Sequence, residues 1–404
     1  MNAQPISFVC PYCDEEKPIN ESSLEHGIPQ FLGGANAPTY FEFSNVCKTC
    51  NSNLGLFVDG SFARSWFAGA ALQECAMLTY DPNNPHYEIP LICMGISDFS
   101  PPNMLNNEVC ENWLGPFGES IFLIRPDDER FYWYSGGNPV EAKRKQQRAY
   151  FFVSENSPKN FQLALTSFKS SFNKKTKKIM CTTFLDFDTG SIGFDKADEL
   201  DQARIAFFKS KVLIKDETRK NRLSINTKFD DRFLCKLGFA IAYGLFGDSF
   251  LDSEYARELR KGIWHNPNDG EASKLFGLST SFNKDKLLEK SLSLDGAVVI
   301  AIIKSHEGHC MSLSISDKQF CIIKIADSLL EYPDYQSNNF FNGIVYVLVP
   351  GLKKHIIMPI IKFIEYKLGN TSHSELDEVA KIVNRNKAYF SSRLPADPLA
   401  APEA

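Results

Sequence analysis

The sequence predicts an α+β fold, in which a small cysteine-stapled N-terminal module precedes a larger mixed portion of antiparallel strands and helices. Two Cys-x2-Cys pairs stand near the N-terminus, apolar runs typical of strands recur toward the C-terminus, and helical periodicities lie between them. Of 404 residues, 43% are hydrophobic and 23% charged, which is the composition of a globular protein and excludes a wholly disordered chain. No apolar run is long enough to predict a membrane span, and the N-terminus does not resemble a signal peptide.

The order of the elements predicts four segments along the chain. They are the N-terminal module at 1–75, a mixed basic region at 76–225, a helical pair with a β-sheet at 226–390, and a disordered tail at 391–404. Runs of β-branched and aromatic residues between polar turns predict strands over 120–126, 130–137, 148–155, 296–304, 310–316, 320–327 and 343–350. Helical spacing predicts helices over 52–73 and 161–172, two within 230–264, and one over 374–387 that begins at Ser374.

The cysteines indicate a metal site and not a disulfide framework. The chain has 11 cysteines, an odd number, and most lie singly among apolar residues, so we expect a reducing, cytoplasmic compartment. The exceptions are the pairs Cys10/Cys13 and Cys47/Cys50, whose four thiolates suit a closed tetrahedral site for structural Zn²⁺. The alternative is four unrelated buried cysteines.

Between the two pairs lies an insert that could carry chemistry. Glu25 and His26 are adjacent within the insert, and Asn51 directly follows Cys50. In an extended strand the side chains of neighbours point to opposite faces, whereas at a strand end or bend both can reach one cleft. A zinc site would fix Asn51 at the start of the following helix and bring it near the insert. The alternative is that His26 has a structural role only and forms a hydrogen bond with a backbone carbonyl.

The pattern C-x2-C, E-H-x-I-P, L-G-G and C-x2-C-N-x2-L-G, over residues 10 to about 66, resembles the HNH endonucleases. These are ββα-metal nucleases with a structural zinc knuckle. The resemblance implies His26 as the general base, and Glu25 and Asn51 as ligands of a catalytic ion. Asn45 is the nearest candidate for the middle asparagine of the motif, with Asn53 and Asp59 as weaker ones.

These residue types suit phosphodiester hydrolysis. A neutral imidazole can accept a proton from water at physiological pH, and a divalent ion can polarise the phosphate and stabilise the leaving oxygen. A carboxylate and an amide oxygen are ligands that suit Mg²⁺, so we expect Mg²⁺ or Mn²⁺ as the catalytic ion.

The N-terminal module is acidic, whereas residues 141–178, within the mixed basic region, are strongly basic. The formal net charge is −5; residues 1–75 hold eight acids and three bases, whereas residues 141–178 hold ten bases and two acids. Because affinity for nucleic acid depends on cationic contacts with phosphates, we expect the basic region to supply them. The predicted contacts are Lys143, Arg144, Lys145, Arg148, Lys174, Lys175, Lys177 and Lys178. The alternative is a solvated loop and an amphipathic helix whose lysines face water.

The sequence therefore predicts a metal-dependent endonuclease that acts on a nucleic acid, with DNA preferred. We expect the C-terminal region to recognise the substrate, a protein partner or a signal, as in a bacterial defence effector, and we expect no membrane association. One catalytic centre cuts one strand, so a dimer is one route to double-strand cleavage. The rival hypotheses are a non-catalytic zinc-stapled module that binds nucleic acid or protein, and a ribonuclease of the same fold.

Overall fold

The structure is a computed structural model that describes residues 7–84, 86–127, 135–138, 140, 147–154, 157–182, 189–212, 220–223, 225, 227–265, 286–328, 330 and 343–391. The chain forms two compact units, and neither is a single stretch of sequence. Unit 1 contains residues 1–63 and 226–383, and unit 2 contains residues 64–225 and 384–404. The division into four consecutive segments stays a prediction.

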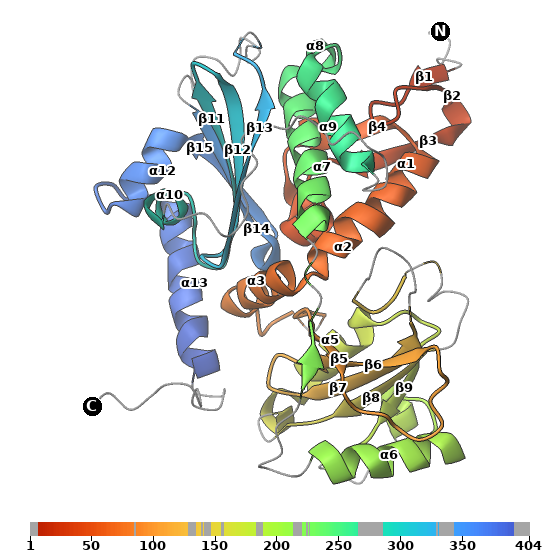
Figure 1. Ribbon diagram of the computed structural model, residues 1–404. Coiled ribbons are helices and arrows are strands. Elements are labelled where there is room, and N and C mark those ends of the chain that lie inside the picture. Colours follow the sequence, from red (N-terminus) through yellow and green to blue (C-terminus); the bar gives the residue numbers. More distant parts are fainter. Residues whose placement is uncertain are drawn as a thin grey trace, which may run out of the picture. The chain divides into compact units, whose positions relative to one another are not determined.

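The N-terminal module, residues 7–63 of unit 1, is built from two short hairpins and a helical segment (Figure 1). Its elements are β1 (Ser7–Val9), β2 (Glu16–Pro18), η1 (Ile19–Glu21), β3 (Ser22–His26), η2 (Gln30–Leu32), η3 (Gly34–Asn36), η4 (Thr39–Phe41), β4 (Glu42–Cys47), α1 (Lys48–Asn53), a π-helical turn η5 (Leu54–Asp59) and α2 (Gly60–Ala63). Strands β1 and β2 pair antiparallel, as do β3 and β4. The predicted helix over 52–73 is interrupted, because a new helix, α3 (Trp66–Leu78), begins with Ser65 as its N-cap.

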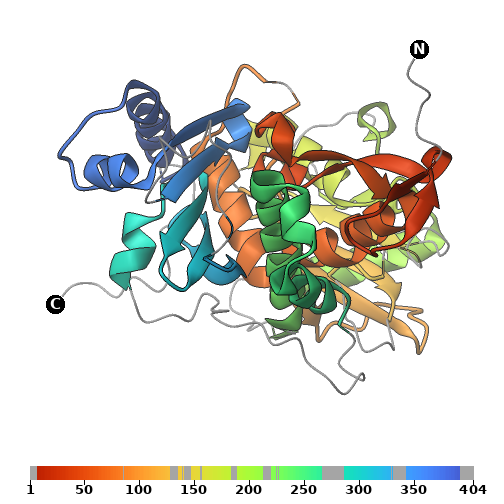
Figure 2. The same cartoon turned by 90° about the horizontal axis from the view of Figure 1, so that it is seen from above.

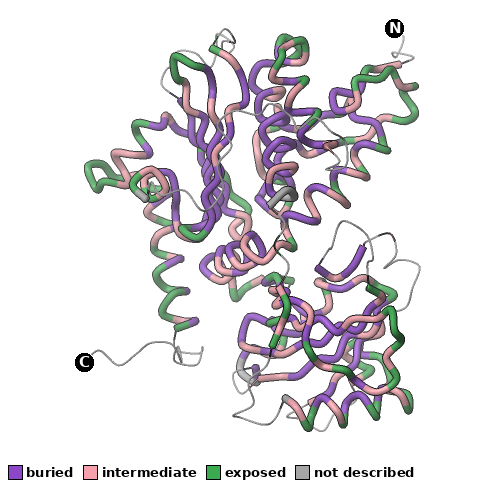
Figure 3. Tube along the Cα trace, viewed as in Figure 1, coloured by how far each residue is buried: buried purple, intermediate pink, exposed green. Residues whose placement is uncertain are grey.

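A five-stranded antiparallel sheet forms the other side of unit 1. The strand order is β13-β12-β11-β14-β15, and the central strands are buried along most of their length (Figure 3). The bounds are β11 (Val298–Ser305), β12 (Gly308–Ile315), β13 (Gln319–Ala326), β14 (Gly343–Val349), η8 (Pro350–Leu352) and β15 (Lys354–Pro359). Helix α10 (Lys286–Ser291) precedes the sheet; α12 (Ile360–Lys367) and α13 (Ser374–Ser391) follow it along the chain.

Helix α7 (Thr227–Phe246) packs against both the sheet and the N-terminal module. A Cβ atom on Gly238 would lie 2.8 Å from Ile325 of β13, and one on Gly244 would lie 2.5 Å from the Phe41 ring. Glycine at these positions therefore lets the helix approach both neighbours closely. Helices α8 (Asp248–Leu251) and α9 (Glu254–Trp264) follow, and Figure 2 shows this helical group beside the N-terminal module.

Unit 2 contains a six-stranded sheet between two helices. The strand order is β10-β5-β6-β7-β8-β9, antiparallel except for the parallel pair β8–β9. Along β8, Phe151 packs in a cluster with Phe168 of α5, whereas Tyr150 packs in a cluster with Phe208 of α6, so the two helices cover opposite faces. The bounds are β5 (Ile92–Ser97), β6 (Glu108–Leu114), β7 (Ser120–Pro126), β8 (Arg148–Phe152), η6 (Ser157–Asn160), α5 (Phe161–Ser171), β9 (Lys177–Met180), η7 (Thr189–Ile192), α6 (Glu199–Val212) and β10 (Asn221–Arg222).

The predicted α+β class is confirmed. The strands predicted in the C-terminal part and the helix that begins at Ser374 are present. Most of the strand predicted at 130–137, and the tail beyond residue 391, lie outside the described residues. None of the described helices combines the length and the apolar character needed to cross a membrane.

The close packing of α7 on the N-terminal module can be tested at Gly244. We expect Gly244→Ala to lower the stability of unit 1 by about 1–3 kcal/mol, because the new methyl group overlaps the Phe41 ring and the Tyr40 carbonyl. Gly55→Ala is the matched control, because a Cβ atom there has no neighbour within 4 Å and alanine favours a helix. Urea unfolding followed by circular dichroism measures both. Equal stability of the two variants would contradict this packing.

Candidate functional site

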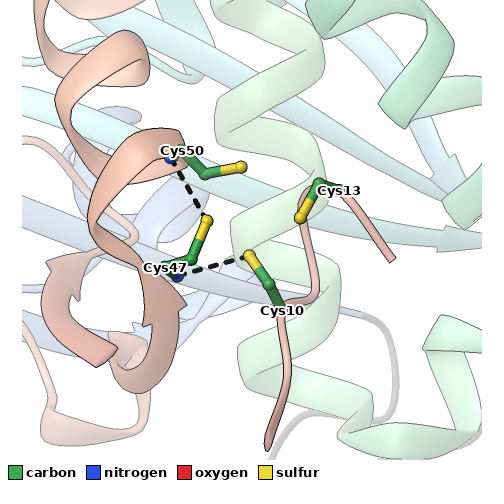
Figure 4. A group of neighbouring side chains, drawn as sticks. All are labelled: Cys10, Cys13, Cys47 and Cys50. Atoms are coloured by element: carbon green, nitrogen blue, oxygen red, sulfur yellow. Dashed lines mark hydrogen bonds between the residues drawn. The ribbon is translucent and has the colours of Figure 1, made fainter. Parts of the chain in front are cut away.

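The four paired cysteines converge in the N-terminal module (Figure 4). The Sγ atoms of Cys10, Cys13, Cys47 and Cys50 all lie within 4.8 Å of one another, and no other group of three or more acidic, histidine or cysteine ligands converges within the described residues. Tetrahedral zinc has Zn–S distances of about 2.3 Å, which places neighbouring sulfurs slightly under 4 Å apart. The four thiols therefore fit a structural Zn²⁺ after a small contraction.

The backbone already supports thiolates at this site. The amide of Cys47 donates to Sγ of Cys10, and the amide of Cys50 donates to Sγ of Cys47, each at 3.4 Å. A hydrogen bond from Cys50 is the main cause that lowers the pKa of Cys10 to about 4, and the same bond raises the pKa of Cys50, so one thiolate of the cluster is favoured without a metal. Because Cys47 also ends β4 and caps α1, a bound zinc ion would fix the strand and the helix together.

Glu25 points into the interior and meets a buried lysine. Its exposed fraction is 5%, and its Oε1 lies 2.9 Å from Nζ of Lys236, a residue of α7 that is fully buried. The same ammonium lies 3.2 Å from Oδ2 of Asp59. Two carboxylates of the N-terminal module therefore share one cation that the C-terminal part of unit 1 supplies.

The electrostatics of this cluster keep the lysine charged. Burial alone would lower the pKa of Lys236, but Asp59 and Glu25 outweigh it and raise the pKa above its ordinary value. Burial raises the pKa of Asp59 to about 6, because the nearby ammonium offsets only part of the desolvation.

His26 lies on the other face of β3 and is opposite Glu42 of β4 in the register. Its Nδ1 atom is buried, has no hydrogen bond, and lies 3.9 Å from Oε1 of Glu42. The side chains of His26 and Glu42 are 25% and 32% exposed. An imidazole with one nitrogen turned toward a carboxylate and part of its ring exposed is an arrangement that can accept a proton from water.

The two predicted asparagines each make a contact that holds the module together. Nδ2 of Asn51 donates to Oγ of Ser23 at 3.0 Å and to the carbonyl of Leu24 at 2.8 Å, which ties α1 to β3. Nδ2 of Asn45 donates to the hydroxyl of Tyr243 on α7 at 3.0 Å.

Residues 10–67 match the family model of the HNH endonucleases. This N-terminal segment is therefore similar to the HNH endonucleases. The match covers most of the residues of the N-terminal module and ends before the six-stranded sheet begins. The comparisons found no matching curated protein and no matching solved structure.

Among the residues predicted for the HNH site, the structure forms two separate groups. Glu25 joins Asp59 and Lys236, whereas His26 joins Glu42. Sequence reasoning missed Lys236 and Glu42. A count along the antiparallel hairpin could have found Glu42, but only with knowledge of the irregularity between Ser23 and Glu25 that sets the register.

The oxygen donors predicted for a catalytic ion do not form an open site in this arrangement. Glu25 is buried against Lys236, and the amide of Asn51 is tied to β3. Glu42 is the carboxylate that lies beside His26 and is partly exposed. The roles of Glu25 and Asn51 as ligands of Mg²⁺ or Mn²⁺ stay predictions.

The basic region has structural partners where the structure describes it. Arg148 and Lys177 both pair with Asp198 and Asp201, and Nζ of Lys178 donates to the carbonyl of Asn173. Lys174 and Lys175 are exposed, and Lys143, Arg144 and Lys145 lie outside the described residues. Contact of these cations with nucleic acid stays a prediction.

We expect the purified protein to contain one zinc ion per chain, measured by atomic emission. Cys47→Ser should lose the zinc and lower the thermal transition of unit 1, because the end of β4 and the start of α1 are no longer held to the β1–β2 turn. Cys310→Ser is the matched control, because Cys310 lies on β12, away from the four-cysteine cluster. Retention of zinc by Cys47→Ser would show that these cysteines are not its ligands.

Proposed function

We propose that the protein is a metal-dependent endonuclease that hydrolyses phosphodiester bonds in DNA. The observation that carries the proposal is the partly exposed His26 imidazole, whose Nδ1 faces the Glu42 carboxylate on a hairpin of the HNH module.

In the proposed reaction His26 is the general base. Its Nδ1 carries the proton and faces Glu42, so Nε2 is the atom that accepts a proton from water. The hydroxide so formed attacks phosphorus, the P–O3′ bond breaks, and the departing oxygen takes up a proton. Glu42 is a positioning residue that holds the tautomer of the ring, and their 3.9 Å separation should shorten when substrate binds. A divalent ion, when bound, would stabilise the departing oxygen.

An HNH module implies contact with nucleic acid, and the exposed Lys174 and Lys175 would add cationic contacts. DNA as substrate, recognition of a partner by the C-terminal region, and a role in defence belong to this proposal. The rival hypothesis is a non-catalytic module that binds nucleic acid or protein, and a cleavage assay separates the two.

We expect the protein to nick or linearise supercoiled plasmid in the presence of Mg²⁺ or Mn²⁺, and His26→Ala to lower the rate by at least about 100-fold. The thermal transition of the variant should match that of the wild type, because the side chain is partly exposed and Nδ1 has no hydrogen bond. His355→Ala, which changes an exposed histidine of β15, is the control.

The same assay tests the metal and the polymer. EDTA should stop cleavage and added Mg²⁺ should restore it, while the zinc content is measured before and after, so that loss of zinc is not mistaken for loss of the catalytic ion. A labelled RNA in parallel separates a ribonuclease from a deoxyribonuclease. Cleavage by His26→Ala at the wild-type rate would exclude His26 as the base.

Glu42→Gln should lower kcat by about 10- to 100-fold and leave KM for DNA nearly unchanged, because the ring loses the partner of Nδ1 but the substrate contacts remain. Glu42→Asp, which keeps the charge, should retain more activity than Glu42→Gln. If both variants cut at the wild-type rate, Glu42 does not position the imidazole.

A further inference from the structure

Lys236 lies on α7, outside the residues that match the HNH family, but its side chain reaches Glu25 within the matched segment. Nothing of its side chain is exposed. Four oxygens surround its ammonium: Oε1 of Glu25 at 2.9 Å, Oδ2 of Asp59 at 3.2 Å, and the carbonyl oxygens of His26 and Gly27, each at 3.4 Å. The ammonium therefore contacts the side chain of Glu25, the residue before the proposed base, and the backbone carbonyls of His26 and Gly27.

The backbone next to His26 also contacts the N-terminal module and α7. Gly27 donates to the carbonyl of Phe41 at 2.7 Å, and a Cβ atom on Gly27 would lie 3.0 Å from Cβ of Ala240 on α7. Strand β3 thus ends against the helix face that presents the lysine. A shift of Lys236 would move the peptide that fixes the direction of the His26 side chain.

The charges explain why a cation is needed at this point. Burying the carboxylates of Glu25 and Asp59 without a partner would strongly lower the stability of the folded state. The ammonium of Lys236 between them offsets part of this loss. A divalent ion bound through Oε1 of Glu25 would have to displace the buried ammonium of Lys236.

We propose that Lys236 is a positioning residue of the nuclease centre: a tethered cation that holds Glu25 and the His26–Gly27 backbone, so that Glu25 supports the general base and does not bind the catalytic metal. The inference rests on the proposed function, and it differs from the expectation that Glu25 is a metal ligand.

The test compares Lys236→Met, Lys236→Arg and Glu25→Gln, with Lys261→Met as the control, because Lys261 is 62% exposed and pairs with Glu258 on the surface of α9. The first readout does not need activity: hydrogen–deuterium exchange of peptides that cover residues 22–27, with zinc content measured in parallel. We expect exchange at least about twofold faster in Lys236→Met, with zinc retained, and no change in Lys261→Met.

The second readout is plasmid cleavage. Lys236→Met should lose at least about 10-fold in kcat, with KM for DNA within about threefold of the wild type, and Lys236→Arg should recover part of the loss. Glu25→Gln should lower kcat without changing the Mg²⁺ concentration for half-maximal cleavage. A merely structural role of Lys236 would lower the amount of folded protein and would not separate kcat from KM.

Three results would overturn the inference. One is unchanged exchange in Lys236→Met. Another is a Mg²⁺ midpoint that falls about tenfold or more in Lys236→Met, which would mean that the lysine masks a metal ligand. The third is a midpoint that rises by a similar factor in Glu25→Gln. If the wild type cuts neither DNA nor RNA, the proposed function fails, and the exchange data still decide whether Lys236 anchors this strand.

Discussion

The ion pairs of the buried Lys236 with Glu25 and Asp59 join the N-terminal module of unit 1 to α7. A charged side chain without exposure is stable only where opposite charges and hydrogen-bond acceptors surround it. Glu25 and Asp59 come from the strand and the helical segment of the N-terminal module, and the lysine comes from α7. Separating the module from α7 would leave the lysine or the two carboxylates without an opposite charge. These ion pairs therefore specify how the module and α7 pack together.

The N-terminal module needs such external support because it is small. Fewer than 60 described residues bury too little apolar surface for much stability of their own, and a structural metal is one common compensation. The four-cysteine cluster, which fits a zinc ion, lies at one end of the module, where β4 meets α1. Helix α7 organises the other, where β3 ends at His26, and glycines at positions 27 and 244 allow the close approach.

The basic region shows how a run of charge in the sequence can have a structural origin. Arg148 and Lys177 lie opposite each other in the parallel pair β8–β9, where two like charges would repel. Asp198 and Asp201, at the start of α6, neutralise both cations, and the Tyr150 hydroxyl also donates to Asp201. Arg148 and Lys177 therefore connect α6 to the edge of the sheet. A count of lysines and arginines in the sequence cannot distinguish this structural role from a phosphate-binding surface.

The sequence by itself determined the features that depend on short spacings. Two Cys-x2-Cys pairs place their thiols in local turns, runs of apolar residues specify β11 to β14, and α13 begins at Ser374, so each was predictable from neighbours in the chain. The HNH motif likewise pointed to His26. The tertiary structure alone decided which partners the motif residues have. Lys236 reaches Glu25 only because α7 packs against β3, and Glu42 faces His26 only because an irregularity in the hairpin sets the register. Both pairings join residues that are distant in sequence, and no local preference of the chain encodes them.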